Sequence, residues 1–289
     1  MESFEYLVAG SVDETLHYLR EGKARLIAGG TDVLVQMQED LIAPDVLVDV
    51  SRIDALKTLK DEKDALVIGA GVTHSQMVKW AKARPPWHAL AQASASVGTP
   101  QVRNIATVVG NLCNAVPSAD LAGPCLLYGA VVHIAGAAGT RQVPLASFFT
   151  GPKKTVLAQN EMVTHLVLAA PPAHSASNYQ KLGPRKASDL AMVGVAALVA
   201  LDGTGLVSTL RLGLNAVAPT PILVEKCAGA TGRPFDAALA ADCALWAAEQ
   251  AKPITDYRAS AEYRRDMVAV LTQRALSACA TQLGKGDLP

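Results

Sequence analysis

The chain has 289 residues, and its 26 Lys and Arg residues balance 26 Asp and Glu residues, which gives a formal net charge of zero. A chain of this length buries roughly three quarters of the surface of its unfolded form and folds into about two domains. Because a neutral chain produces no long-range field, the balance argues against a nucleic acid or an anionic membrane surface as a partner.

The first unit of the chain alternates helix and strand patterns. Residues 11–14, Ser-Val-Asp-Glu, form a capping box that predicts a helix, and residues 25–30 form a short apolar strand that runs into two glycines. Either Thr31 or Asp32 can cap the helix that follows. Residues 46–50 predict a second strand, so we expect residues 1–60 to form an N-terminal α/β subdomain.

The second unit begins after a polar stretch, residues 60–64, with a strand over residues 65–70. A capping box at residues 73–76 predicts a helix that ends before Pro85. Apolar runs then alternate with Gly, Pro, Asn and Ser as far as residue 170, and this pattern predicts a mixed α/β subdomain over residues 61–175.

Two features bear on membranes and location. Residues 121–140 carry no charged side chain, but glycines and a proline interrupt them at turn spacing, so we expect a buried sheet region and no membrane span. The first residues show neither a basic leader nor an apolar signal core, and we therefore expect a cytoplasmic protein.

The third unit follows a linker that begins at Pro171-Pro172. Two apolar runs, residues 192–201 and 206–217, flank Asp202-Gly-Thr-Gly205 and predict a hairpin. Two Ala-rich helices are expected over residues 236–252 and 260–283. In the second, Tyr263, Met267, Val270, Leu271 and Leu276 form an apolar stripe, and Arg264, Arg265 and Arg274 lie mostly away from it. We expect residues 176–289 to form an α+β domain.

The cysteines and histidines of this sequence are not arranged in a pattern typical of a metal site or a catalytic site. The five cysteines are odd in number and include no CxxC pair, so they support neither a zinc or iron–sulfur site nor a full disulfide framework. Cys113 is expected to be a small core residue and the histidines to be structural or exposed. We therefore expect no catalytic side chain and no metal ligand, so any redox chemistry requires a bound cofactor.

Two polar loops are candidates for binding that cofactor. Residues 28–33, Ala-Gly-Gly-Thr-Asp-Val, lie between a strand and a helix, where bare amides suit a phosphate, although a simple tight turn explains the same residues. Residues 106–120 gather hydroxyl and amide side chains that suit a sugar and a phosphate, or that bond to their own backbone. A basic cluster at residues 181–186 could hold a second anion or be a solvated loop.

Taken together, these segments resemble the FAD-binding medium subunit of the xanthine dehydrogenase family of molybdenum hydroxylases. The resemblance is carried by residues 28–33, residues 103–111 with Asp120, residues 148–152, and Lys181 with residues 185–189. It extends over essentially the whole chain. It implies an α+β protein with an FAD-binding fold of the vanillyl-alcohol-oxidase type, built from two α/β subdomains, plus a C-terminal domain of antiparallel sheet and helices.

The resemblance also implies the cofactor-binding residues. The first loop would wrap the pyrophosphate of FAD, the second would hold another phosphate and the ribityl chain, and further positions would lie near the cofactor. In this sequence the implied residues are Leu26, Ile27, Ala28, Gly29, Gly30, Thr31, Asp32, Val33, Val97, Thr107, Val108, Val109, Gly110, Asn111, Asp120, Val163 and Lys181. A side chain added at Gly30 would then stand where the phosphate must approach.

The function implied is electron transfer. Electrons would leave a substrate at the molybdenum cofactor of a large subunit, pass through two [2Fe-2S] clusters of a small subunit, and reach this FAD and then NAD⁺ or another acceptor. The assembly implied is a dimer of heterotrimers. Two other functions remain open at this stage: a free-standing flavin oxidase of the same fold, and a scaffold subunit that has lost FAD.

One part of the resemblance is incomplete. Arg185 and Lys186 match a mobile loop that lies near the flavin in NAD-linked members, but Ala187-Ser188 replaces the acidic residues found there in animal members. The electron acceptor is therefore open. A four-cysteine insertion that carries an additional iron–sulfur cluster in the hydroxybenzoyl-CoA reductase type is absent from this sequence.

Overall fold

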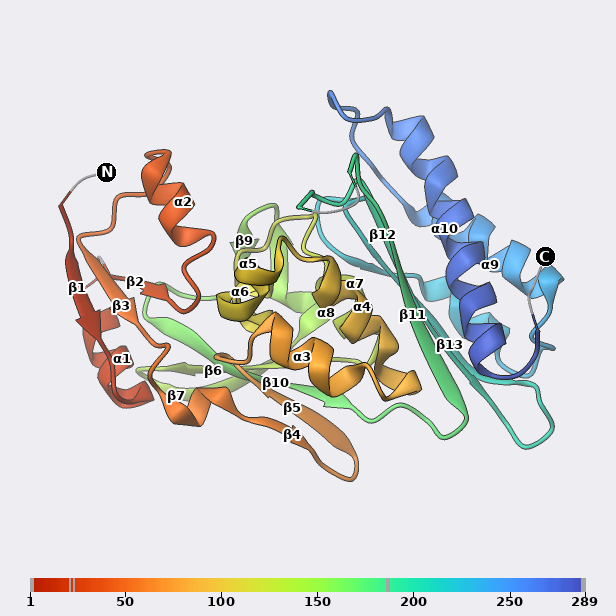
Figure 1. Ribbon diagram of the computed structural model, residues 1–289, viewed down its shortest axis with the longest axis horizontal. Coiled ribbons are helices and arrows are strands. Elements are labelled where there is room, and N and C mark those ends of the chain that lie inside the picture. The colour runs from red at the N-terminus through yellow and green to blue at the C-terminus, as the bar shows by residue number, and fades with distance from the viewer. Residues whose placement is uncertain (1–2, 21, 23, 186–187, 287–289) are drawn as a thin grey trace.

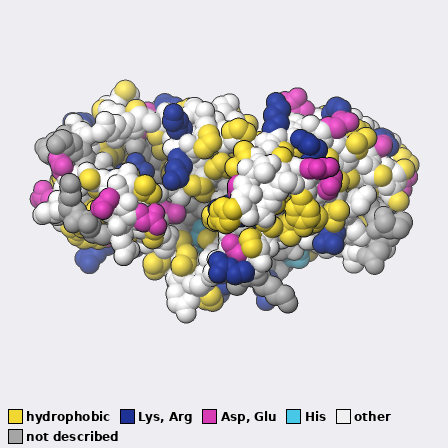
Figure 2. All heavy atoms as spheres, turned by 90° about the horizontal axis from the view of Figure 1, so that it is seen from above, with side chains coloured by type: hydrophobic (Ala, Val, Ile, Leu, Met, Phe, Trp, Pro, Cys, Tyr) yellow, Lys and Arg dark blue, Asp and Glu magenta, His cyan; other side chains and the backbone are white. Residues whose placement is uncertain are grey.

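Three larger sheets follow one another along the long axis of the molecule, with helices between and outside them, and two short strands form a fourth sheet (Figure 1). The computed structural model describes residues 3–20, 22, 24–185 and 188–286. Charged side chains of both signs are interspersed over the face shown in Figure 2, in keeping with the neutral composition.

The first sheet is parallel and has three strands. β3 (Val46–Asp49) lies in its centre and pairs with β1 (Glu5–Val8) on one side and β2 (Ala24–Ile27) on the other. The connections are α1 (Val12–Leu19) and α2 (Val33–Gln38), and this confirms the expected alternation of helix and strand. Ser11 caps α1 by accepting a hydrogen bond from the Glu14 amide, as its capping box predicts.

The second sheet has five strands in the order β4-β5-β10-β6-β7, and every neighbouring pair is antiparallel. This differs from the mixed α/β pattern expected for this unit, because two hairpins flank one long central strand. Its strands are β4 (Leu59–Asp61), β5 (Ala65–Gly69), β6 (Val131–Gly136), β7 (Gly139–Pro144) and β10 (Glu161–Ala169).

A layer of helices separates the second sheet from the third. It contains α3 (His74–Ala81), α4 (His88–Ser96), α5 (Pro100–Ile105), α6 (Val108–Cys113) and α7 (Ala122–Leu127). In this layer, α6 contacts β5 and β10 of the second sheet, whereas α4 and α7 contact strands of the third. Short elements complete the unit: η1 (Asp54–Lys57), η2 (Pro85–Trp87), α8 (Leu145–Phe148), β8 (Phe149–Gly151) and β9 (Lys154–Thr155).

The uncharged stretch over residues 121–140 is only partly sheet. Its first apolar piece is the helix α7, all of whose residues are buried, and its second is β6. The expectation of strands for the first piece was wrong, because a short apolar run fits a buried helix as well as a buried strand. In the part of the chain that the structure describes, no helix has both the length and the apolar character needed to cross a membrane.

The third sheet is antiparallel and has four strands. They are β11 (Ser175–Leu182), β12 (Val193–Leu201), β13 (Val207–Asn215) and β14 (Ile222–Leu223), followed by η3 (Glu225–Ala230), α9 (Ala237–Gln250) and α10 (Ala261–Gln282). The hairpin expected around residues 202–205 joins β12 to β13, and the Asp202 carboxylate accepts hydrogen bonds from the Thr204 and Leu206 amides. The two C-terminal helices are also confirmed.

The face that α10 buries differs from the expected stripe. Arg264 is 3% exposed, whereas Tyr263 is 46% exposed. The Arg264 guanidinium donates to the Asp256 carboxylate at 2.7 Å and to the Met192 carbonyl at 3.1 Å. A charge buried in this way is paired and hydrogen-bonded, so the pattern of apolar residues alone placed it wrongly.

β12 is covered on both faces. Val193, Val195 and Val199 belong to the core beneath α9 and α10, whereas Ala196 and Leu198 belong to the core shared with the helix layer and the second sheet. A strand buried on both sides needs a continuous apolar sequence, which explains the uninterrupted run in this segment. The third sheet is therefore packed firmly against the rest of the molecule.

Candidate functional site

A cavity of about 1100 Å³ lies between the first sheet and the helix layer. Its walls come from the turn between β2 and α2, from residues 97–120, from β10, and from Asp189 and Leu190 after β11. Fourteen of the residues implied by the resemblance line it: Leu26, Ala28, Gly29, Gly30, Thr31, Asp32, Val33, Val97, Thr107, Val109, Gly110, Asn111, Asp120 and Val163.

Three of the implied residues do not line the cavity. Ile27 and Val108 are buried in the apolar cores, at 8% and 0% exposure. Alternation along a strand and the turn of a helix point these two side chains away from the cavity, although their neighbours face it. Lys181 forms an ion pair at 2.8 Å with Asp120, which does line the cavity.

The turn between β2 and α2 places at the cavity backbone amides without a hydrogen-bond partner in the described part of the chain. Among the described residues, nothing accepts a hydrogen bond from the backbone amides of residues 29–33. Gly29 packs directly against the backbone of Ile105 and Ala106, where a Cβ atom would overlap the Ile105 oxygen. The two polar loops therefore meet at this glycine, and the turn presents unpaired N–H groups.

Gly30 has a different role from the one expected. Its φ of +71° is in the left-handed region, and a Cβ atom there would lie 3.0 Å from Ile27 and 3.2 Å from Leu34. The added side chain would thus meet the two neighbouring side chains and not the open cavity. The need for glycine comes from the backbone conformation and from this crowding.

Of the two candidates for the cap of α2, Asp32 is at the N-cap position and Thr31 precedes it. Asp32 makes no side-chain capping bond, and its carboxylate instead hydrogen-bonds to Asn114. Although Asp32 is exposed as a whole residue, its surroundings remove part of the hydration of the carboxylate and raise its pKa; Asn114 and the charge of Lys153 oppose this rise. Asn114 also accepts from Gln36 of α2 at 3.0 Å, so it joins the two loops.

The second polar loop bonds partly to its own backbone. Thr107 caps α6 by accepting from the Gly110 amide at 3.0 Å, and Asn111 accepts from the Leu121 amide at 3.4 Å. The interpretation of these side chains as local backbone partners is therefore correct for two of them. Both residues nevertheless line the cavity.

The Asp120 carboxylate is held from the third sheet. It accepts from Lys181 Nζ at 2.8 Å and from the Tyr179 hydroxyl at 2.7 Å, and it is 6% exposed. Burial raises the pKa of Asp120, and the positive charge of Lys181 opposes that rise. Tyr179 was not among the residues expected at the site, although its position two residues before Lys181 on one strand places both side chains on the same face.

His74, which was expected to be structural or exposed, lies in the cavity wall. It is fully buried, and neither ring nitrogen has a hydrogen-bond partner among the described residues. Burial, with a smaller effect of the Arg103 charge, lowers the pKa of His74 to about 4. The imidazole is therefore neutral near pH 7, as a structural histidine would be.

Cys113 also lines the cavity, and burial raises its pKa to about 12. Its thiol is therefore protonated and a poor nucleophile, in agreement with its interpretation as a small packing residue. Across the described ranges no group of three or more His, Cys, Asp or Glu side chains could hold a metal ion. The site has the features of a binding cavity.

The loop implied to lie near the flavin reaches the cavity mouth. Asp189 and Leu190 line the cavity, and Asp189 pairs with Arg185 at 3.1 Å. Lys186 and Ala187 lie outside the described residues.

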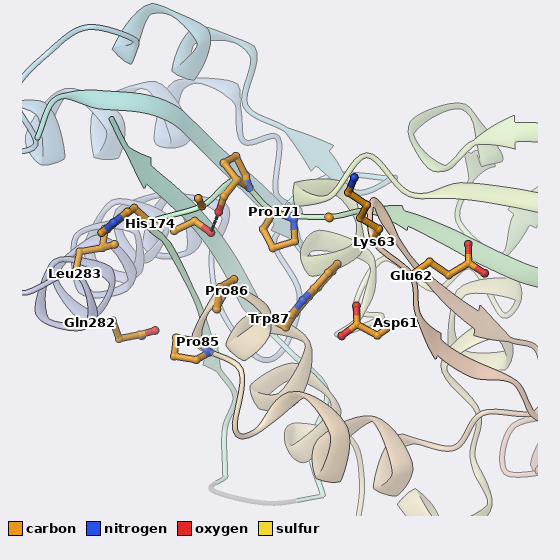
Figure 3. Close-up of a pocket in the computed structure, with 14 residues that line it drawn as sticks. Asp61, Glu62, Lys63, Pro85, Pro86, Trp87, Pro171, His174, Gln282 and Leu283 are labelled. Atoms are coloured by element: carbon orange, nitrogen blue, oxygen red, sulfur yellow. Dashed lines mark hydrogen bonds between the residues drawn. The ribbon is translucent and has the colours of Figure 1, made fainter. Parts of the chain in front are cut away.

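A second cavity, of about 560 Å³, lies elsewhere (Figure 3). It is formed by the turn after β4, by Trp87 with two prolines of η2, by residues 170–175, and by the C-terminal end of α10. None of the residues implied for cofactor binding lines it.

Comparisons with known proteins agree with this arrangement. Residues 2–171 match the family described as "FAD binding domain in molybdopterin dehydrogenase", and residues 178–279 match the "CO dehydrogenase flavoprotein C-terminal domain". The chain is 32% identical over 283 residues to a xanthine dehydrogenase FAD-binding subunit of Escherichia coli, covering 96% of this chain and 97% of the relative.

Two solved structures are similar over nearly the whole chain. A carbon monoxide dehydrogenase chain from Hydrogenophaga pseudoflava superimposes with a TM-score of 0.91 at 30% identity, covering 97% of this chain and 98% of that one. A quinoline 2-oxidoreductase chain from Pseudomonas putida 86 gives a TM-score of 0.89 at 28% identity and covers 98% of both chains. The mixed helix and sheet architecture is shared with both.

Proposed function

Because the chain belongs to the FAD-binding family of molybdopterin dehydrogenases, we propose that it is the electron-transfer subunit of a molybdenum-containing hydroxylase or dehydrogenase. Electrons released from a substrate at the molybdenum cofactor of a large subunit would pass through two iron–sulfur clusters of a small subunit to the FAD of this chain. From there they would go to NAD⁺ or to another acceptor.

The main support for this proposal is that a large cavity is lined by backbone amides without a hydrogen-bond partner among the residues that the structure describes. At about 1100 Å³ the cavity is slightly larger than the roughly 300–1,000 Å³ of pockets for drug-sized ligands, and it can therefore take a larger, extended cofactor. The unpaired amides of residues 29–33 fit the anionic diphosphate of a dinucleotide, because successive N–H groups form a concave site for anions. The residues present therefore fit FAD.

When bound, FAD supplies the ability to accept electrons singly and to release them in pairs. The chain's own residues have other tasks. The turn at Gly29 and Gly30 offers hydrogen-bond donors, Asp120 offers a fixed acceptor, and Val97, Val109 and Val163 provide apolar wall that excludes water. Neutral His74 and the protonated Cys113 thiol take no part as acid, base or nucleophile.

The partner subunits are proposed from the family and from the names of relatives. A relative with 31% identity over 283 residues is named the medium chain of a carbon monoxide dehydrogenase, which implies further chains in that enzyme. For this protein we propose a large molybdenum-cofactor subunit and a small iron–sulfur subunit, assembled as a dimer of heterotrimers. The five cysteines of this chain are free thiols, as is common in the reducing cytoplasm, where we place the assembly.

Two measurements test the proposal. The visible spectrum of the purified chain, before and after addition of FAD, should show a bound flavin; a protein that stays colourless with excess FAD would favour the scaffold function. Purification from the native host should recover the chain with molybdenum and iron. A lone chain that turns over a substrate without either metal would overturn the subunit assignment in favour of a flavin oxidase. Assays of the intact complex with NAD⁺, oxygen and quinone would then identify the acceptor.

A further inference from the structure

We infer that Tyr179 and Asn215 are positioning residues, through which the C-terminal sheet fixes the Asp120 carboxylate at the wall of the cofactor cavity. The inference rests on the proposed FAD site and adds to it: retention of FAD and its optical spectrum would depend on a hydroxyl and an amide that do not line the cavity.

Both oxygens of the Asp120 carboxylate are engaged from one strand. Tyr179 donates to Oδ1 at 2.7 Å and Lys181 donates to Oδ2 at 2.8 Å. The two residues are separated by two positions on β11, so their side chains project from the same face of the strand. A carboxylate with a donor on each oxygen cannot rotate without losing a hydrogen bond.

The Tyr179 hydroxyl also accepts a hydrogen bond. Asn215, at the end of β13, donates its side-chain amide to that hydroxyl at 3.2 Å. The hydroxyl therefore accepts from Asn215 and donates to Asp120, which fixes the direction of its proton. Tyr179 is 5% exposed and Asn215 is 1% exposed, so water does not compete for these bonds.

A glycine in the middle strand makes room for this contact. β12 lies between β11 and β13, and Gly194 on β12 is in register with Lys181 on one side and Asn215 on the other. A Cβ atom at Gly194 would overlap the side-chain amide of Asn215. The Asn215 side chain thus lies across Gly194 and reaches Tyr179 on the next strand but one.

These contacts leave the Asp120 carboxylate the role of a hydrogen-bond acceptor toward a cofactor in the cavity. Its two oxygens are held, Lys181 provides the compensating charge, and Lys181 in turn donates to the Ser96 carbonyl at 3.2 Å. Asp120 lines the cavity, and a carboxylate has more lone pairs than the donors of Tyr179 and Lys181 use. Loss of the Tyr179 hydroxyl would free one oxygen and alter the acceptor that a bound cofactor meets.

The chain offers a matched control. Tyr128 is 1% exposed, and its hydroxyl donates to the Pro86 carbonyl at 2.8 Å and accepts from the Ser177 hydroxyl at 2.9 Å. It lies at the same boundary between the helix layer and the third sheet, but it does not line the cofactor cavity. Tyr128→Phe therefore removes an equally buried hydroxyl without disturbing Asp120.

The experiment compares Tyr179→Phe, Tyr128→Phe and the wild-type chain. Each protein is freed of flavin, and FAD is titrated back while flavin fluorescence and the visible absorption spectrum are recorded. We expect Tyr179→Phe to bind FAD about tenfold more weakly, as for the loss of a hydrogen bond to a charged group, and to shift the flavin absorption bands. Tyr128→Phe should keep both properties while losing thermal stability.

The outcomes separate the inference from the proposed function. A wild-type chain that does not bind FAD would overturn the proposed function itself. If the wild type binds FAD, equal affinity and an unchanged spectrum in Tyr179→Phe would overturn the inference, as would an equal loss in Tyr128→Phe. Should Tyr179→Phe fail to fold, Asn215→Leu provides the same comparison, with an expected loss of affinity of about twofold to fivefold because it removes the more distant hydrogen bond.

Discussion

The α-carbon of Gly29 faces the backbone oxygen of Ile105, and the contact between these two residues joins the two polar loops of the cofactor cavity. Ile105 ends α5, and Ala106 and Thr107 lead into α6. The close approach is possible only without a side chain at position 29. The width of the cavity at this point is therefore set by backbone packing.

Gly29→Ala should separate the two loops. Overpacking of backbone against a new Cβ atom typically costs about 1–3 kcal/mol, and we expect the variant to lose FAD as well as stability. Thermal unfolding and flavin content measure both effects. Gly203→Ala is the control, since nothing lies within 4 Å of a Cβ atom at that glycine. Equal behaviour of the two variants would contradict the proposed contact.

Removal of the charge on Lys181 should leave Asp120 buried without compensation. Their side chains are 14% and 8% exposed, and removing one partner of a buried pair costs about 3–5 kcal/mol. We therefore expect Lys181→Met to be strongly destabilised and Lys181→Met combined with Asp120→Asn to recover part of the loss. Urea unfolding of the single and double variants measures the coupling; purely additive effects would show that the pair is not coupled.

His74 predicts a dependence of stability on pH. Burial lowers its pKa from 6.5 to about 4 in the folded protein. In the unfolded chain the imidazole takes up a proton near pH 6.5, so folding stability is complete above that pH and falls as the pH decreases towards about 4. The difference corresponds to about 3 kcal/mol.

His74→Leu should remove this dependence, because leucine does not titrate. Urea unfolding at about pH 7 and about pH 4.5 should show a smaller loss of stability in the variant than in the wild type. Parallel pH profiles in the two proteins would show that His74 is already protonated in the folded state or is not buried.

Arg264 and Arg265 are neighbours on α10 with opposite environments, since only Arg264 is buried. Arg264→Met would leave the Met192 carbonyl without its donor and remove one cation from Asp256, at a cost of about 3 kcal/mol or more. Arg265→Met should change the free energy of unfolding by less than about 0.5 kcal/mol. Equal effects of the two substitutions on the melting temperature would refute the assignment of the buried face.

Much of the fold and of the cavity could be predicted from local sequence. Capping boxes located the starts of α1 and α3, the turn residues 202–205 located the hairpin between β12 and β13, and paired glycines pointed to the turn at the cavity. These features depend on neighbouring residues in the chain, whose backbone preferences act over one or two turns. The family resemblance, in turn, implied a set of cofactor residues of which fourteen line the cavity.

Other features were decided only by tertiary packing. The apolar run at α7 fits a buried helix or a buried strand by its pattern alone, and only the folded structure shows that it is a helix. The sequence by itself determined which segments are polar, glycine-rich or apolar. It could not determine that Asn215 reaches across Gly194 to Tyr179 and so to Asp120, because that contact joins segments far apart in the chain. Such contacts depend on strand register and on how the sheets pack, and neither property is encoded in any single segment.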